Sequence, residues 1–271
     1  MHHHNLDSRF QALPIKDIVE ENENTRTFVF EYNLGSEPGQ FVMLWLPGVD
    51  EKPFSVAWDD GKEFWLTICR VGGTTEELFK LGVGDKVGIR GPFGTHYKWE
   101  AGEHLALVSG GYGAAPMYFV ARKAIEDGCK IEFLTGARNE NLLLFLDKVK
   151  DFKDLNTHVS TDDGSKGHKG FITEVLAQVL DAGGVDRVFC CGPERMMKAV
   201  GDVADKHGKV PAWLSMEKYM KCGIGVCGQC AVDDSGEIVC RKGPVMAWDG
   251  LRDSPEMGKY HRDAQGKKHY L

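Results

Sequence analysis

The chain lacks any apolar run long enough to cross a membrane. Its most apolar window, residues 105–121, is interrupted by glycines and a proline, whereas a bilayer span needs about 20 consecutive apolar residues. No membrane segment is therefore expected. The N-terminus also lacks the apolar core of a signal peptide, so we expect a cytoplasmic protein, and the run His2–His4 is set aside as either a tag remnant or native sequence.

The chain also lacks an excess of basic residues. Its formal net charge is −7, and no Lys/Arg block is longer than a pair. Proteins that bind nucleic acid usually carry a basic patch that neutralises phosphates, so a nucleic-acid partner is not expected. The 10 histidines are scattered without a pattern of partners. No catalytic residue is therefore assigned among the side chains.

The length and the pattern of the chain predict two domains and an appendage. With 271 residues it exceeds the ~100–150 residues of a single domain. Residues 11–100 form short alternating segments between turns, which predicts an all-β sandwich or barrel. We expect its single helix to start at Thr74, with Glu77 completing a capping box. Residues 101–211 alternate strands and helices, one of them over 140–150, which predicts a doubly wound parallel sheet. Residues 212–271 hold a cysteine cluster and a polar tail.

Cysteine is concentrated in that last segment. Without an export signal, the 8 cysteines are expected to be thiols or metal ligands rather than disulfides. Cys222, Cys227, Cys230 and Cys240 have the spacing C-x4-C-x2-C-x9-C, whose first part is that of plant-type [2Fe-2S] ligation. The alternative is a structural zinc site, but such sites usually contain two C-x2-C pairs and this segment contains one.

Two loops at the carboxyl ends of predicted strands indicate a nucleotide site. VSGGYGAAP, residues 108–116, joins a strand to a helix, and its glycines would let a pyrophosphate approach the backbone at a helix N-terminus. Cys191-Gly192-Pro193 ends the last clear strand and is expected to face the same crevice. In the β domain, Lys52–Ser55 and Gly72–Thr75 offer a cation, a hydroxyl and a helix start, which would suit a flavin and its pyrophosphate.

In this order, the motifs resemble the ferredoxin–NADP reductase superfamily. Residues 11–250 are similar to one branch of it, the electron-transfer subunits of NAD-linked, heteromeric dihydroorotate dehydrogenase, most specifically over 216–230 and 239–245. The resemblance implies an α/β plus all-β fold: an FAD-binding β barrel over 11–100, a doubly wound NAD(P)-binding domain over 101–211, and a [2Fe-2S] module with a tail over 212–271.

The resemblance also implies the residues that bind each cofactor. FAD would be bound by Lys52, Pro53, Phe54, Ser55, Thr67, Ile68, Cys69, Arg70, Gly72, Gly73, Thr74 and Thr75. The nicotinamide nucleotide would be bound by Gly110, Gly111, Gly113, Pro116, Asp162, Asp163, Cys191, Gly192 and Pro193. The cluster ligands would be Cys222, Cys227, Cys230 and Cys240.

Lys52 departs from the family pattern, which usually has arginine there. Lysine cannot make the planar bidentate contact to phosphate that arginine makes. Either FAD is held less tightly, or Arg70 or Arg90 shares the task. The resemblance favours NAD over NADP, although Arg138 after the second strand of the nucleotide domain could meet a 2′-phosphate.

Electron counting requires a flavin between the other two centres, because a nicotinamide gives two electrons as hydride and a [2Fe-2S] cluster accepts one. The implied partner is an FMN-containing dihydroorotate dehydrogenase catalytic subunit, in a heterotetramer that serves pyrimidine biosynthesis. Alternatives are a diaphorase-type subunit of a soluble hydrogenase and the small subunit of a ferredoxin:NADP transhydrogenase. The second is disfavoured because its pattern has Asp in place of Cys222. A non-catalytic, zinc-stapled interaction module is the alternative from a different class.

Overall fold

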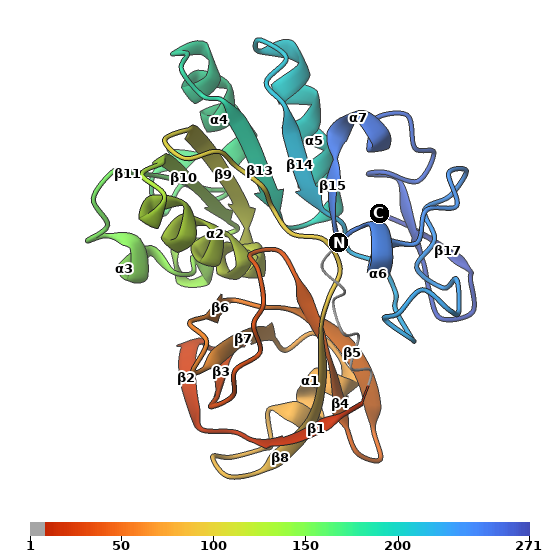
Figure 1. Ribbon diagram of the computed structural model, residues 1–271. Helices are drawn as coiled ribbons and strands as arrows, with labels where there is room; N and C mark the ends of the chain where they lie inside the picture. The colour runs from red at the N-terminus through yellow and green to blue at the C-terminus, as the bar shows by residue number, and fades with distance from the viewer. Residues whose placement is uncertain (1–8) are drawn as a thin grey trace.

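The first part of the molecule is a β barrel made of two packed sheets (Figure 1). The structure is a computed structural model and describes residues 9–271, so the run His2–His4 lies outside the described residues. The strand orders are β1-β8-β4-β5 and β2-β3-β7-β6, with antiparallel neighbours throughout. The elements are β1 (Gln11–Pro14), β2 (Asp17–Asn22), β3 (Thr25–Phe30), β4 (Phe41–Leu46), β5 (Asp50–Ser55), β6 (Trp58–Asp59), β7 (Phe64–Cys69), α1 (Gly73–Leu78) and β8 (Lys86–Phe93). The predicted all-β domain is confirmed.

The helix of the barrel has its N-cap two residues earlier than expected. Its N-cap is Gly72, and the Thr75 hydroxyl accepts hydrogen bonds from the backbone N–H groups of Val71 and Gly72 at 2.9 and 3.1 Å. The predicted capping by Thr74 and Glu77 is therefore wrong. Thr75 satisfies donors that would otherwise lack a partner at the start of the helix.

The second part is a seven-stranded sheet of order β12-β11-β10-β9-β13-β14-β15. All its neighbours are parallel except β14 and β15, which confirms the predicted parallel sheet. Its strands are β9 (His104–Gly110), β10 (Lys130–Ala137), β11 (Leu155–Thr161), β12 (His168–Lys169), β13 (Arg187–Cys191), β14 (Ala212–Ser215) and β15 (Val245–Ala247). Because β14 and β15 follow residue 211, the C-terminal part of the chain completes one edge of this sheet.

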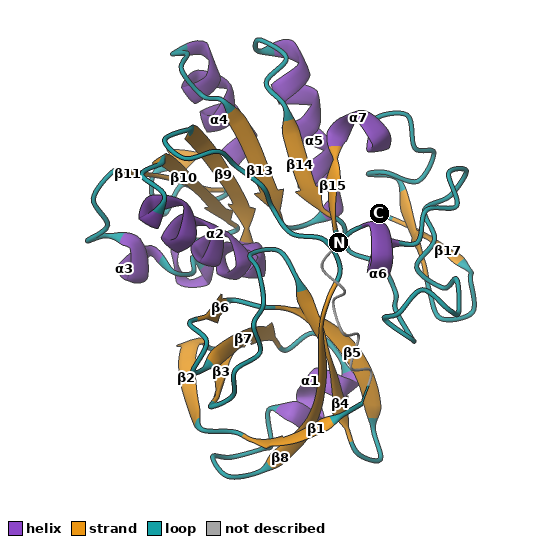
Figure 2. Ribbon diagram, in the orientation of Figure 1, coloured by secondary structure: helices purple, strands orange, loops and turns teal. Residues whose placement is uncertain are grey.

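Helices cover both faces of this sheet (Figure 2). The helices are η1 (Gly111–Gly113), α2 (Ala114–Glu126), η2 (Glu140–Leu142), α3 (Leu146–Val149), α4 (Ile172–Asp181) and α5 (Glu194–Lys206). Helix α2 packs on the face that carries Ile131 and Phe133, whereas α4 and α5 pack on the face of Val108 and Leu134. Alternate residues of a strand point to opposite faces of the sheet. Because helices cover both faces, the strands can be apolar at consecutive positions.

The helix predicted over residues 140–150 is wrong. Two short pieces, η2 and α3, stand in its place, separated by Phe145 in the left-handed region at φ 64°. Leu144 and Phe145 are both buried, and Phe145 packs on Tyr118 of α2 with ring centroids 5.1 Å apart. Burial of these two side chains against α2 outweighs the helical propensity of the segment.

The C-terminal part contains α6 (Val239–Lys242), α7 (Trp248–Leu251) and a hairpin of β16 (Tyr260–Arg262) and β17 (Lys268–Tyr270). The tail thus ends in an ordered hairpin. Arg262 pairs with Asp233 at 2.8 Å, and Lys218 pairs with the fully buried Glu256. Breaking the buried Lys218–Glu256 pair would leave an uncompensated charge, so this contact fastens the tail to the cysteine segment.

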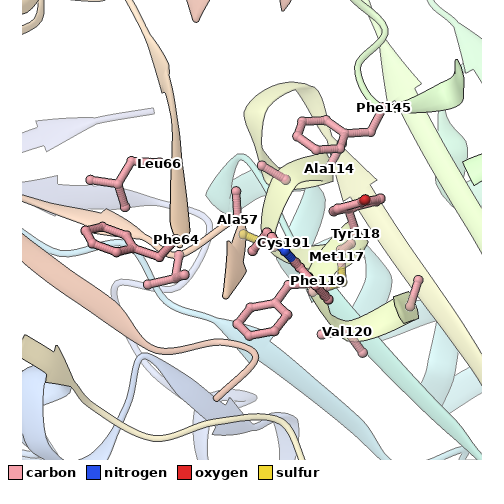
Figure 3. Close-up of a cluster of buried hydrophobic side chains, with 14 of the residues drawn as sticks. Ala57, Phe64, Leu66, Ala114, Met117, Tyr118, Phe119, Val120, Phe145 and Cys191 are labelled. Atoms are coloured by element: carbon pink, nitrogen blue, oxygen red, sulfur yellow. The ribbon is translucent and has the colours of Figure 1, made fainter. Parts of the chain in front are cut away.

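The barrel and the sheet share one hydrophobic core. Figure 3 shows the barrel residues Ala57 and Phe64 in one cluster with Met117 and Phe119 of α2. Trp58 of the barrel also packs edge-on against Phe119, with ring centroids 5.5 Å apart. Continuous apolar packing of this kind holds the two domains in one relative orientation.

No helix within residues 9–271 is both long enough and apolar enough to span a lipid bilayer.

A buried carboxylate, Glu132 of β10, stabilises the sheet near the N-terminal ends of its strands, away from the glycine loops. Glu132 accepts hydrogen bonds from His158 Nε2 at 2.6 Å, His104 Nε2 at 3.0 Å and Asn156 Nδ2 at 3.1 Å. Burial alone would raise the pKa of Glu132, but these three partners outweigh burial and lower the pKa below its ordinary 4.5. The stabilisation is therefore present above pH 4.5 and is lost as the pH falls through the folded-state pKa.

We expect Glu132→Gln to lower the free energy of unfolding by about 1–2 kcal/mol at pH 7, since hydrogen bonds to a charged acceptor are lost. The loss should shrink at a pH below 4.5, as the pH falls toward the lowered pKa of the folded-state carboxyl. Urea unfolding at both pH values measures the difference. Glu174→Gln is the control: Glu174 pairs with His168 at 2.6 Å but is 54% exposed, so the change should be within about 0.5 kcal/mol. Equal losses for Glu132→Gln at both pH values would contradict the assignment.

Candidate functional site

Strands β5 and β7 hold the residues predicted to line FAD. Residues 51–55 of β5 are all half-buried, because β5 is an edge strand paired only with β4. Thr67 and Ile68 of β7 are buried, whereas Cys69 is half-buried and Arg70 is exposed. The start of α1 lies beside β5, so the structure brings the three predicted FAD segments together.

Lys52 is held in place by groups from two parts of the chain. Its ammonium lies 2.6 Å from Asp50 and 4.7 Å from the ring centre of Tyr219, three residues before the first clustered cysteine. Burial alone would lower the pKa of Lys52, but the contact with Asp50 reverses this and raises it, so the side chain remains a cation.

The two arginines considered as substitutes for Lys52 are engaged elsewhere. Arg90 is buried and donates from Nε to Glu51 at 2.6 Å. Arg70 donates to Asn24 at 3.1 Å. Lys52 and Arg70 are therefore the two cations among the predicted FAD residues, and each already has a hydrogen-bonding partner within the chain.

The two predicted nucleotide loops lie against each other, as expected. Ser109 and Cys191 are register partners on the parallel strands β9 and β13. A Cβ at Gly113 would lie 2.1 Å from the carbonyl oxygen of Cys191, and one at Gly192, where φ is +155°, would lie 2.9 Å from the N atom of Gly110. Only glycine permits this close backbone approach. Pro116 is buried in the first turn of α2.

Asp162 and Asp163 lie just beyond β11, at the same carboxyl ends of the strands as the two loops, and are exposed. Their backbone N–H groups donate to the carbonyls of Ala137 and Arg138 at 3.1 and 3.2 Å, so the loops after β10 and β11 are joined. The Asp163 carboxylate accepts from Ser165 Oγ at 2.6 Å. Arg138 is also exposed at these strand ends.

Tyr112 and Glu217 were not singled out from the sequence, yet they lie where the three parts meet. The Tyr112 hydroxyl donates to Glu217 Oε2 at 2.8 Å. Burial, Glu217, Cys191 and Cys69 all raise the pKa of this hydroxyl. The signal for Tyr112 in the sequence was an aromatic residue in the middle of a glycine loop. Only the fold pairs it with Glu217, more than 100 residues away.

The four clustered cysteines lie as two pairs. Cys222 Sγ accepts from the N–H groups of Val226 and Cys227 at 3.3 and 3.4 Å, and Cys230 Sγ accepts from the N–H of Cys240 at 3.4 Å. Gly223 and Gly225 have φ of +67° and +82°, which turns these N–H groups toward sulfur. In residues 9–271, no three His, Cys, Asp or Glu side chains form a cage for a single metal ion.

Two of the clustered thiols, Cys222 and Cys230, have a lowered pKa. Burial opposes ionisation of Cys222, but N–H groups of Cys227, Ile224 and Val226 lower its pKa to about 7. A hydrogen bond from Cys240 lowers the pKa of Cys230 to about 6 and raises that of Cys240. Thiolates bind iron, and a [2Fe-2S] cluster takes four cysteines, two on each iron. The two pairs, with N–H groups directed at sulfur, therefore fit such a cluster.

The cysteine segment also docks on the barrel. A Cβ at Gly223 would lie 2.9 Å from Met43 of β4, and Thr95 donates from its hydroxyl to the Val245 carbonyl at 2.8 Å. The first cysteine thus lies close to the barrel that carries Lys52.

Comparison with known proteins agrees with this arrangement. Residues 107–202 match the family model described as an oxidoreductase NAD-binding domain, and residues 217–252 match the iron–sulfur cluster binding domain of dihydroorotate dehydrogenase B. Among solved structures, that of an NADH-dependent reduced ferredoxin–NADP oxidoreductase is similar with a TM-score of 0.80 and 30% identity, covering 88% of this chain and 89% of that one. Phthalate dioxygenase reductase shares the fold at a TM-score of 0.59 and 21% identity, over 72% of this chain and 64% of its own.

The fold and site thus define a reductase of the ferredoxin–NADP reductase type that carries an iron–sulfur module. The probable electron transfer subunit of dihydroorotate dehydrogenase B (NAD⁺) from Methanocaldococcus jannaschii is 45% identical, covering 94% of this chain and 96% of the relative. The corresponding protein of Thermococcus kodakarensis is 42% identical, covering 89% of this chain and 98% of its own. The chain belongs to the family of dihydroorotate dehydrogenase B electron transfer subunits.

Proposed function

We propose that this chain transfers electrons between NAD(H) and a catalytic partner subunit, using bound FAD and a [2Fe-2S] cluster. The observation that carries the proposal is that the turn of Tyr112 lies against β7 and β9 while its hydroxyl donates to Glu217, so that the three parts of the chain meet there. Cys69 ends a strand of the predicted FAD site, Cys191 belongs to the predicted nucleotide loops, and Glu217 lies five residues before Cys222. Electron transfer needs the three centres close together, and this junction supports that.

Each group of predicted residues has a role that its chemistry supports. In the barrel, Lys52 would neutralise FAD phosphate and Ser55 would lie near the reactive edge of the flavin, with the other FAD residues named above around it. Gly113 and Gly192 let the two loops pack against each other at the start of α2, whose helix N-terminus would favour the anionic pyrophosphate. Asp162 and Asp163 would contact the adenosine part of the nucleotide.

The cluster would be held by Cys222 and Cys227 on one iron and by Cys230 and Cys240 on the other. When bound, FAD accepts an electron pair as hydride and releases electrons singly to the cluster. The chain's own groups bind and orient: the loop N–H groups stabilise thiolate charge, and burial of Cys230 and Cys240 excludes water. No side chain is needed as a general base.

We propose further that the partner is an FMN-containing dihydroorotate dehydrogenase subunit, that the two chains form a heterotetramer, and that the complex serves pyrimidine biosynthesis. The chain spans nearly the whole length of relatives named as electron transfer subunits of that enzyme. A protein that only relays electrons requires a second chain to act on dihydroorotate, which supports a heteromer.

The test is coexpression of this chain with the dihydroorotate dehydrogenase subunit from the same source, followed by anaerobic purification. We expect a complex that contains FAD, FMN, iron and acid-labile sulfide and that reduces NAD⁺ with dihydroorotate, whereas the catalytic subunit alone does not. Zinc in place of iron would overturn the redox function. A pull-down that returns hydrogenase subunits would overturn the proposed partner.

A further inference from the structure

None of the roles assigned so far explains the side chain of Tyr112. It is the central residue of η1, between two glycines of the nucleotide loop, and its side chain is a large ring that remains 38% exposed. Its hydroxyl donates to Glu217 Oε2 at 2.8 Å, and Glu217 is itself exposed. The contact therefore lies at the mouth of the site rather than in the hydrophobic core.

The groups around the Tyr112 hydroxyl show where its ring lies. The hydroxyl donates to Glu217, which follows β14, and, in addition to burial, the nearby thiols of Cys191 at the end of β13 and Cys69 at the end of β7 help to raise its pKa. The 3-10 turn that carries Tyr112 also lies directly against β7. The phenol consequently lies between the strand predicted to line FAD and the loop predicted to hold the nucleotide.

Hydride transfer sets a strict requirement on this space. The reacting atoms of a nicotinamide and a flavin must approach to about 3–3.5 Å, so the nicotinamide ring has to enter between the FAD strand and the nucleotide loop. A phenol and a nicotinamide ring are both six-membered and similar in size, and the two cannot occupy one space.

We propose that the Tyr112 ring fills the nicotinamide position in the absence of nucleotide, and that its hydrogen bond to Glu217 holds it there until the nucleotide displaces it. The inference rests on the proposed function, since it concerns the same site. Tyr112 is then a residue that sets nicotinamide affinity. The apparent dissociation constant equals the intrinsic one divided by the fraction of molecules whose ring has swung out.

The change Tyr112→Phe removes the hydroxyl, and with it the hydrogen bond to Glu217, but keeps the ring. We expect Tyr112→Phe to bind NAD⁺ about three- to tenfold more tightly than the wild type, because the lost hydrogen bond to a carboxylate favoured the closed position. Tyr112→Ala, which also removes the ring, should bind NAD⁺ at least as tightly as Tyr112→Phe. The KM for NADH should fall in parallel.

The experiment is calorimetric titration of the oxidised holoenzyme with NAD⁺ and, separately, with ADP-ribose, which lacks the nicotinamide ring. A ring that competes only with nicotinamide leaves ADP-ribose affinity unchanged in Tyr112→Phe. The matched control is Tyr118→Phe, which removes a hydroxyl 3.1 Å from Arg122 in the same domain and should change neither affinity. FAD and iron content establish that each variant is folded.

Unchanged or weaker NAD⁺ binding by Tyr112→Phe would overturn the proposal, as would an equal gain for ADP-ribose, which would indicate a general change in the loop. Failure of the proposed function gives a different result: the wild-type holoenzyme would then bind neither NAD⁺ nor ADP-ribose.

Discussion

Replacing Cys240 by alanine is expected to reduce the iron and acid-labile sulfide of the purified chain by more than about tenfold while FAD stays bound. Cys240 is 1% exposed at the start of α6 and pairs with Cys230 across the hairpin that follows the cysteine loop. Its loss leaves one iron with a single thiolate. Dihydroorotate-dependent reduction of NAD⁺ by the complex should fall more than about 100-fold, because electrons can no longer cross between the subunits.

NADH oxidation by ferricyanide should survive in the same variant within about twofold, since this reaction needs only the flavin and nucleotide sites. Cys129→Ala is the matched control: Cys129 is also buried, but its sulfur lies near the Glu100 carbonyl, far along the sequence from the cluster. The control should keep its iron. Full iron content in Cys240→Ala, measured together with the visible spectrum, would show that Cys240 is not a ligand.

Replacing Gly113 by alanine is expected to weaken NAD⁺ binding more than about 30-fold and to destabilise the protein by about 2–4 kcal/mol. The new Cβ would lie 2.1 Å from the carbonyl oxygen and 2.5 Å from the carbonyl carbon of Cys191. Both contacts are with backbone, so no side-chain rotation relieves them. The loops after β9 and β13 must move apart, and the proposed pyrophosphate site moves with them.

Thermal unfolding and titration with NAD⁺ measure the two effects, and the visible spectrum reports whether flavin and cluster remain bound. Gly250→Ala is the control, because no atom lies within 4 Å of the position of its Cβ and the residue is helical in α7. Alanine there should leave stability unchanged or slightly higher. Normal NAD⁺ affinity in Gly113→Ala would contradict the close approach of the two loops.

The sequence predicted best where one local pattern has one physical cause. Alternation of strands and helices from His104 to Lys206 predicts a parallel sheet with both faces covered, because parallel strands need helical crossovers. The spacing from Cys222 to Cys240 likewise predicts four cluster ligands, and this assignment stays a prediction. Prediction from the sequence failed in two places. At residues 140–150, burial of Phe145 against Tyr118 breaks the predicted helix, and at the start of α1, Thr75 supplies the cap.

The sequence by itself determined the kinds of chemistry present: the thiolates of the cysteine cluster, the glycine loops at strand ends, and the order of the three parts. The tertiary structure alone decided what meets across them: Tyr112 with Glu217, Lys52 with Tyr219, and Gly113 with Cys191. The reason is physical. Spacing and periodicity relate residues that are near one another in the sequence, whereas these contacts join residues that only the packing of strands and domains brings together.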